Sequence, residues 1–165
     1  YMLNGKELIE RKIITNVPEE NVQQHGIDLN VIEIELLTGG GVIPHQGKTV
    51  LGNSVQQPLI SDQAIWKLHP GTYSVRFSQG CDIPSDTMLL IRQRSSLLRN
   101  GTILHSSVFD AGFKTDNIGT VMIVTVPITI QYKARIAQIY NHNCTLVENL
   151  YNGQFQNDKQ RDGAK

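Results

Sequence analysis

The chain has 165 residues, of which 39% are hydrophobic, and its 15 lysines and arginines balance its 15 aspartates and glutamates. This is the size of one domain with one core. The longest strongly apolar stretch, residues 118–130, is too short for a membrane-spanning helix. The balanced charge gives no reason to expect binding to nucleic acid or to an acidic membrane. The N-terminal residues do not resemble a signal peptide, so we expect a cytoplasmic protein.

Cysteines and histidines give no sign of a bound metal. Cys81 and Cys144 are far apart and form no C-x-x-C pair, so we expect reduced, half-buried thiols. The five histidines form neither an H-E-x-x-H nor an H-x-E pattern. Protein-bound zinc is therefore not expected.

The first predicted element is a short helix over residues 5–12. Asn4 and Glu7 have the spacing of a capping box, and Leu8, Ile9 and Ile13 form a short apolar stripe.

The elements after this helix are predicted to be strands. They are rich in Val, Ile, Thr and Tyr, and several alternate apolar with polar residues. The predicted strands cover residues 31–37, 72–77, 87–92, 118–126, 128–132 and 134–140. Many short strands with little helix predict an all-β sandwich or barrel of jelly-roll type.

Two segments depart from this pattern. Residues 38–62 are rich in glycine, proline and asparagine, and we interpret them as an excursion within one domain that covers residues 1–150. Residues 151–165 become polar and are expected to be a mobile tail, or a segment that a ligand orders.

The residues with the clearest chemical potential lie between positions 94 and 113. Arginine and serine side chains gather there as donors for an anionic phosphate, namely Arg94, Ser95, Ser96 and Arg99. Asp110 supplies a carboxylate that can orient or deprotonate a water. Taken alone, the arginines also fit a solvated turn, and Asp110 also fits a turn residue that satisfies backbone donors.

The order of several motifs separates these alternatives. They are Gly26-Ile-Asp-Leu29, Arg94-Ser-Ser-Leu-Leu-Arg-Asn-Gly101, Asp110-Ala-Gly-Phe113, Arg135-Ile-Ala-Gln138 and an aromatic and glutamine-rich tail. Together they resemble the dUTPase and dCTP deaminase superfamily over nearly the whole chain except residues 38–62. The resemblance implies a distorted jelly roll (a dUTPase-like β-clip) that forms a homotrimer with active sites at the subunit interfaces.

The resemblance also implies roles for individual residues. One subunit would bind the triphosphate through Arg94, Ser95, Ser96 and Arg99. The hairpin of another subunit would receive the base and the deoxyribose, using Ser106, Ser107, Phe113 and the catalytic Asp110. The tail would close over the nucleotide with Tyr151, Phe155, Gln156 and Lys159. Asp28 would lie near Mg²⁺ through a coordinated water, although a structural cap or turn aspartate stays open as the alternative. Arg135 and Gln138 lie in a predicted central strand and are therefore expected to be structural or interface residues.

The two branches of this superfamily differ in one carboxylate. Deamination needs a group that carries protons between water and the pyrimidine ring. In the deaminase branch that group is a glutamate on the strand after the Asp-Ala-Gly-Phe turn, but here no carboxylate occurs between Asp116 and Glu148. Hydrolysis of dUTP to dUMP and pyrophosphate needs only Asp110, Mg²⁺ and the arginines. We therefore expect a dUTP diphosphatase. A dCTP deaminase, a bifunctional enzyme and a non-catalytic nucleotide-binding trimer stay open as alternatives.

Two departures from the family pattern leave parts of the site open. The residues after Phe113 are longer and more polar than in the family, and the tail carries Gln154 where deaminase-like relatives have lysine. Lys159 or Arg161 is expected to take over that phosphate contact.

Overall fold

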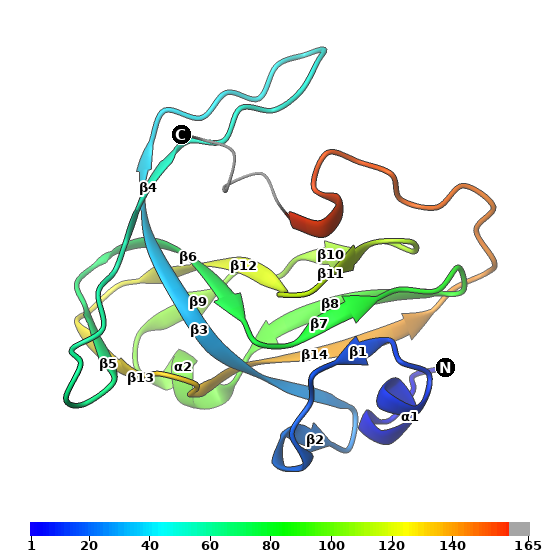
Figure 1. Cartoon of the computed structure of the whole chain (residues 1–165), viewed down its shortest axis with the longest axis horizontal. Coiled ribbons are helices and arrows are strands. Elements are labelled where there is room, and N and C mark those ends of the chain that lie inside the picture. The colour runs from blue at the N-terminus through cyan, green and yellow to red at the C-terminus, as the bar shows by residue number, and fades with distance from the viewer. Residues whose placement is uncertain (159–165) are drawn as a thin grey trace.

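Residues 1–158 of the computed structural model are described here, and they form a curled assembly of antiparallel strands (Figure 1). The largest sheet has the strand order β10-β8-β14-β3-β6-β12-β9, and β2 and β4 also pair with β3. The bounds of these strands are Val22–Gln23 (β2), Gly26–Gly39 (β3), Asn53–Gln56 (β4), Gly71–Phe77 (β6), Thr87–Gln93 (β8), Thr102–Leu104 (β9), Val108–Phe109 (β10), Gly119–Val124 (β12) and Arg135–Asn143 (β14).

Within residues 1–158, two smaller sheets and four short helical segments accompany the largest sheet. The sheets have the orders β1-β7-β11 and β13-β5. The bounds of the remaining elements are Gly5–Glu10 (α1), Ile14–Thr15 (β1), Glu19–Asn21 (η1), Ile65–Leu68 (β5), Gly80–Asp82 (β7), Ser95–Arg99 (α2), Lys114–Thr115 (β11), Ile128–Gln131 (β13) and Gln156–Asp158 (η2). No helix within residues 1–158 is long and apolar enough to cross a bilayer.

The long strand β3 gives the assembly its curl. Its first part pairs with β14 through residues 27–30, and its second part pairs with β6 from Val31 onward. A register shift between Val31 and Glu33 marks an irregularity where the strand changes partners. Because one strand belongs to both halves, the sheet folds over on itself, and the predicted distorted jelly roll is confirmed.

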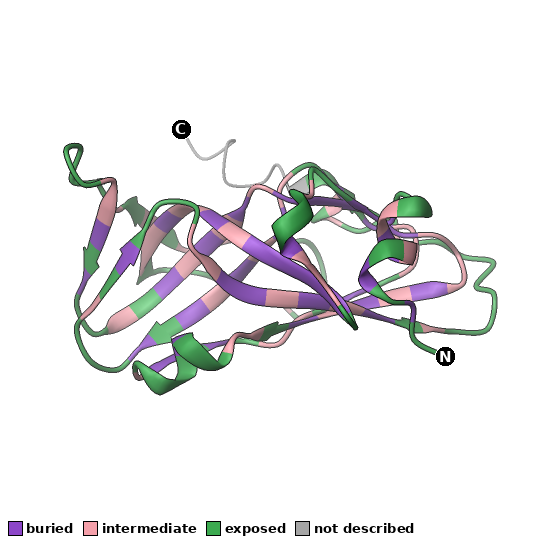
Figure 2. Ribbon diagram, turned by 90° about the horizontal axis from the view of Figure 1, so that it is seen from below, coloured by how far each residue is buried: buried purple, intermediate pink, exposed green. Residues whose placement is uncertain are grey.

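The core lies between the curled layers, and buried and exposed residues alternate along the long strands (Figure 2). Strands β3, β6, β8, β12 and β14 contribute the fully buried side chains of Leu29, Val75, Ile91, Met122 and Ile139. This alternation is the period-2 pattern from which the strands were predicted. It leaves the opposite faces of the same strands available for contacts with ligands or partners.

The N-terminal helix confirms its predicted cap but is shorter than predicted. The side chain of Asn4 accepts a hydrogen bond from the backbone of Glu7, and the Glu7 carboxylate accepts one from the backbone of Asn4. The helix ends at Glu10 because Lys12 adopts a positive φ of 56°, and the N–H of Ile13 returns to the carbonyl of Leu8. This pattern terminates helices, so the predicted end at residue 12 was wrong.

Residues 38–62 contain more structure than the sequence predicted. Strand β4 pairs with the end of β3, and residues 40–52 between them form a projecting hairpin, called the arm below (Figure 1). Val42 and Val50 form a bridge within the arm. The glycine content of this segment hid the strand, because turn residues mask a four-residue element.

The two cysteines differ from each other, and the expectation that both are half-buried was wrong. Cys81 is buried on β7, whereas Cys144 is exposed, and both are free thiols. Burial raises the pKa of Cys81 to about 12.

Candidate active site

A tight turn between β10 and β11 presents Asp110. The N–H of Phe113 bonds to the carbonyl of Asp110, and the N–H of Gly112 bonds to the carbonyl of Ile83. Gly112 has a φ of 88°, and a Cβ at this position would lie 2.6 Å from the Cβ of Leu150. The turn therefore needs glycine both for its backbone conformation and for the close approach of the tail.

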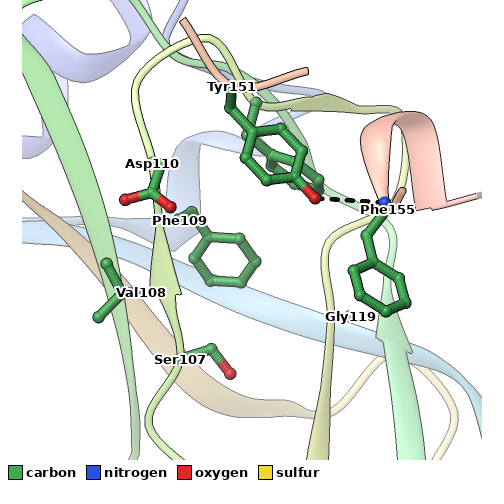
Figure 3. A pocket seen from close by; sticks show the side chains of 8 residues that line it. Ser107, Val108, Phe109, Asp110, Gly119, Tyr151 and Phe155 are labelled. Carbon is green, nitrogen blue, oxygen red and sulfur yellow. Dashed lines mark hydrogen bonds between the residues drawn. The ribbon is translucent and has the colours of Figure 1, made fainter. Parts of the chain in front are cut away.

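This turn and the tail enclose a cavity of about 380 Å³ (Figure 3). Its lining consists of Ser107, Val108, Phe109, Asp110, Phe113, Gly119, Tyr151 and Phe155. The ring of Phe113 packs against Phe109 at 5.6 Å and against Tyr151 at 5.5 Å between centroids. The cavity is thus largely aromatic, with polar atoms at a few points only, which is typical of small-molecule sites.

Asp110 is the only carboxylate that lines this cavity within the described residues. Its side chain is exposed, and within residues 1–158 no hydrogen bond or ion pair engages its carboxylate. Figure 3 shows the carboxylate at the edge of the space toward which the rings of Phe109 and Phe155 turn. An unengaged carboxylate beside an apolar cavity can accept a proton from a bound water.

The chain after β14 turns back along β10 and β11 (Figure 1). Its residues Tyr151 and Phe155 line the cavity. The N–H of Tyr151 bonds to the carbonyl of Ala111 at 2.8 Å. The side chain of Gln156 donates to the carbonyl of Gly112 at 2.9 Å and accepts from the N–H of Lys114 at 2.9 Å. The tail up to residue 158 therefore lies on the turn between β10 and β11 of its own chain, called the Asp110 turn below. The predicted residue Lys159 lies outside the described residues.

The serines predicted to read the base occupy different positions. Ser107 lines the cavity, and its hydroxyl shares a hydrogen bond of 3.1 Å with that of Thr120. Ser106 does not line the cavity. Sequence reasoning missed Val108, Phe109 and Gly119 as lining residues. For Phe109 a signal existed, since it directly precedes Asp110 on the same short strand.

Asp28 lies in a second polar cluster on β3. Its Oδ2 is 3.4 Å from Nε of Arg94 and 3.5 Å from Nη1 of Arg135, and it accepts a hydrogen bond from Gln23 at 3.2 Å. The side chain is only 2% exposed. Burial raises the pKa of Asp28 above its usual 3.8, while Arg94 and Arg135 act in the opposite direction. Asp28 thus joins two segments that are far apart in the sequence, β14 and the start of α2.

The predicted phosphate donors do not line the aromatic cavity. Arg94 precedes α2 as its N-cap residue, and its backbone N–H bonds to the carbonyl of Ile136. Ser95, Ser96 and Arg99 lie on α2, and all three are exposed. A single chain therefore brings the cavity residues together and brings Asp28 to Arg94, but it does not bring these two groups into one pocket.

Possible metal ligands are sparse in the part of the chain that the structure describes. No group of three or more histidine, cysteine, aspartate or glutamate side chains is arranged there to hold a metal ion. Asp28 is the carboxylate beside Arg94, and the contacts described above all converge on its Oδ2.

Comparison with known proteins places this chain in a family. Residues 4–143 match the dCTP deaminase-like family, and the chain belongs to it. A relative from Methanocaldococcus jannaschii, named deoxyuridine 5'-triphosphate nucleotidohydrolase, is 37% identical over 144 residues, covering 87% of this chain and 92% of the relative. A relative from Halobacterium salinarum, named probable deoxyuridine 5'-triphosphate nucleotidohydrolase, is 32% identical over 150 residues, covering 87% of each chain.

Among solved structures, the fold is similar to that of a 2'-deoxycytidine 5'-triphosphate deaminase from Agrobacterium tumefaciens. The TM-score is 0.64 at 16% sequence identity, and the match covers 85% of this chain and 47% of the other. At this level of identity the likeness concerns the fold alone.

Proposed function

We propose that this protein is a dUTP diphosphatase, which converts dUTP and water to dUMP and pyrophosphate. We place it among the cytoplasmic enzymes of nucleotide metabolism that keep uracil out of DNA. The observation that carries the proposal is the exposed carboxylate of Asp110 at the edge of an aromatic cavity where no second carboxylate lies among the described lining residues. The names of the relatives from Methanocaldococcus jannaschii and Halobacterium salinarum support the same reaction.

The composition of β12 argues for hydrolysis over deamination. Deamination needs a group that carries protons between water and the pyrimidine ring. Strand β12, which follows β11 and contributes Gly119 to the cavity, contains no carboxylate. The family takes its name from dCTP deaminase, so a deaminase or bifunctional enzyme is the alternative that the experiment below must separate.

The chain's own residues supply the steps of hydrolysis. Asp110 accepts a proton from the water that attacks the α-phosphorus. A bond forms between the water oxygen and this phosphorus, and the bond from phosphorus to the bridging oxygen of the β-phosphate breaks. Arg94 and Arg99, with the hydroxyls of Ser95 and Ser96, stabilise the negative charge on the departing pyrophosphate. The aromatic cavity receives the base and the sugar, with Phe113 against the sugar and Ser107 at the base.

We propose that the complete site lies between copies of a homotrimer. The phosphate donors of α2 and the cavity of Asp110 lie apart within one chain. The surface near α2 also exposes apolar side chains: Leu98 is 51% exposed, and Ile103 and Ile123, which face each other across β9 and β12, are 47% and 43% exposed. Such a surface supports contact with a second copy.

Mg²⁺ fits this site as a substrate-bound ion. Mg²⁺ retains several waters and is usually bound through one or two carboxylates together with phosphates. Asp28 offers one carboxylate, and its Oδ2 is already shared by Arg94, Arg135 and Gln23. We therefore propose that the triphosphate holds the ion and that Asp28 contacts it only through water. When bound, the ion neutralises charge on the phosphate oxygens.

The reaction is tested by incubating the purified protein with Mg²⁺ and either dUTP or dCTP and separating the products. We expect pyrophosphate and dUMP from dUTP, and no dUTP or dUMP from dCTP. Uracil nucleotides formed from dCTP would establish the deaminase or bifunctional alternative. Binding of dUTP without release of pyrophosphate would establish a non-catalytic protein.

The shared site has its own test. Asp110→Asn and Arg94→Ala each disable a different half of the site, so each variant alone is expected to be inactive. Mixing the two after reversible dissociation places an intact cavity beside an intact phosphate half in some of the trimers. We expect activity to return in the mixture, and persistent inactivity in assemblies proven to be mixed would place the whole site within one chain.

A further inference from the structure

Within the described residues, the side chain of Gln154 joins the tail to the arm. Nε2 of Gln154 donates to the carbonyl of Thr49 at 2.6 Å, and the N–H of Thr49 donates to Oε1 of Gln154 at 3.0 Å. The side-chain amide therefore pairs with the backbone of Thr49 as a neighbouring strand would. Both residues are half-buried. The sequence predicted no role for the arm, and position 154 stood out only because it carries glutamine where deaminase-like relatives have lysine.

The two residues next to Gln154 in the chain, Gly153 and Phe155, both lie against Tyr151. The N–H of Phe155 bonds to the hydroxyl of Tyr151 at 3.2 Å (Figure 3). A Cβ at position 153 would lie 2.5 Å from that hydroxyl, so Gly153 allows the chain to pass closely over the tyrosine. The tail is thus bound to the Asp110 turn through Tyr151 and Gln156, and to the arm through Gln154.

The arm also borders the space next to the cavity. A second hollow is lined by Leu51, Ser74, Arg76, Gly119, Thr120, Val121 and Phe155. It shares Gly119 and Phe155 with the aromatic cavity, and Leu51 comes from the arm. Phe155 therefore stands between the two spaces. Its place depends on the residue before it, Gln154, and on the residue that Gln154 binds.

We propose that Gln154 is a positioning residue that binds the tail to the arm and thereby holds Phe155 at the boundary of the nucleotide cavity. The arm then belongs to the enclosure of the substrate. The kinetic consequence rests on the proposed dUTP diphosphatase activity, but the contact between arm and tail does not.

The chemistry of the contact is specific to an amide side chain. Pairing with both backbone groups of Thr49 needs one donor and one acceptor on the same planar group, which glutamine supplies. Lysine has only donors, and an ionised glutamate has only acceptors. Gln154→Lys and Gln154→Glu each keep the side-chain length to within about one atom but lose one of the two bonds.

The contact is tested by trypsin at the bond between Lys48 and Thr49. Lys48 is exposed, while the backbone of the next residue is bonded to Gln154. Cleavage of a folded protein follows the population of the locally open form. We expect Gln154→Ala to speed cleavage at this bond about tenfold, and Gln63→Ala, which alters an exposed glutamine elsewhere, to leave it unchanged. Equal cleavage rates in the two variants would overturn the contact.

The positioning role is tested by the kinetics of dUTP hydrolysis. Gln154→Ala is expected to raise KM about fivefold with a smaller change in kcat, since Phe155 bounds the cavity but does not touch the reacting phosphorus. Gln154→Lys and Gln154→Glu should fall between the parent and the alanine variant. A lysine variant that binds dUTP more tightly than the parent would overturn the proposal, because it would assign position 154 to phosphate binding.

A double-mutant cycle links the two residues. Thr49→Pro removes the backbone donor of the arm, so the combined variant should raise KM no further than the larger single effect. Additive effects would overturn the pairing of these residues as the cause. Absence of pyrophosphate release by the parent would contradict the proposed function, whereas the trypsin comparison would still decide the contact.

Discussion

The two aspartates of the proposed site occupy opposite environments. Asp110 is exposed at the edge of an aromatic cavity, and no side-chain partner engages it within residues 1–158. Asp28 is 2% exposed and is bound by two arginines and a glutamine. An unengaged carboxylate can accept a proton, whereas a buried carboxylate between arginines fixes the positions of those arginines. Residue type alone therefore does not assign a chemical role, because the surroundings decide what the carboxylate can do.

The largest effect is expected from Asp110→Asn. An amide cannot accept the proton of the attacking water, so kcat should fall by about 10²- to 10⁴-fold, measured as pyrophosphate release. Binding of a non-hydrolysable dUTP analogue should change little, since the amide has nearly the same shape. Asp116→Asn, at an exposed aspartate directly after β11, is the matched control. Equal activity of the two variants would remove Asp110 from the mechanism.

Asp28→Asn should lower activity without lowering stability. Without the carboxylate, Arg94 loses the partner that orients it, so kcat/KM should fall by about 10- to 100-fold. Stability at neutral pH should be kept or increased, because burial raises the pKa of the Asp28 carboxyl more than Arg94 and Arg135 lower it, so asparagine removes an unfavourable charge. Thermal unfolding of this variant, with Asp62→Asn at an exposed position as control, measures the second effect. A large loss of stability at neutral pH would contradict this interpretation.

The same aspartate gives a pH dependence of known sign. A folded-state pKa above the usual 3.8 means that the folded protein holds this proton more tightly than the unfolded chain does. The stabilisation is present in full below pH 3.8 and is lost as the pH rises through the raised pKa. In denaturant titrations, the free energy of unfolding of the parent, relative to that of Asp28→Asn, should therefore fall as the pH rises through this range. A rise would show that the arginines outweigh burial.

Gly112→Ala should disturb the turn beside Asp110 and leave the surroundings of Asp28 unchanged. The added Cβ meets the Cβ of Leu150 and forces a non-glycine residue to a φ of 88°, so the free energy of unfolding should fall by about 1–3 kcal/mol. Gly47→Ala is a matched control, since Gly47 has a φ of 98° but no atom within 4 Å of the added Cβ. Any excess loss at Gly112, measured by denaturant unfolding, reports the close approach of the tail. Equal losses would leave only backbone strain.

The smallest effect concerns the thiols and leaves activity unchanged. Cys81 lies on β7, which pairs with β11, the strand after the Asp110 turn. Burial raises the pKa of Cys81 to about 12. A thiol reagent should therefore modify Cys144 in the native protein and reach Cys81 only after unfolding. Cys144→Ser should abolish the native reaction. Rapid modification of Cys81 in that variant would show that the pairing of β7 with β11 opens readily.

Local patterns in the sequence predicted much of the fold. The strands over residues 72–77 and 87–92 are found almost as predicted, because one face of each is buried and the side chains alternate. The cap of α1 followed from two residues three positions apart. Strand β4 and the short strand β10 were missed, since elements of two to four residues carry too few side chains for a period to stand out.

The strand-rich class, the helix cap and the kinds of chemical groups that a nucleotide site needs could be predicted from the sequence, because these depend on residue type and short spacing. The contacts between distant segments came from the tertiary structure. It showed that Asp28 binds Arg94 and Arg135, that the tail up to residue 158 lies on the Asp110 turn of its own chain, and that Gln154 joins this tail to the arm. Each of these contacts joins residues that are far apart in the chain, and no local pattern encodes which distant partner a side chain meets once the sheet has curled.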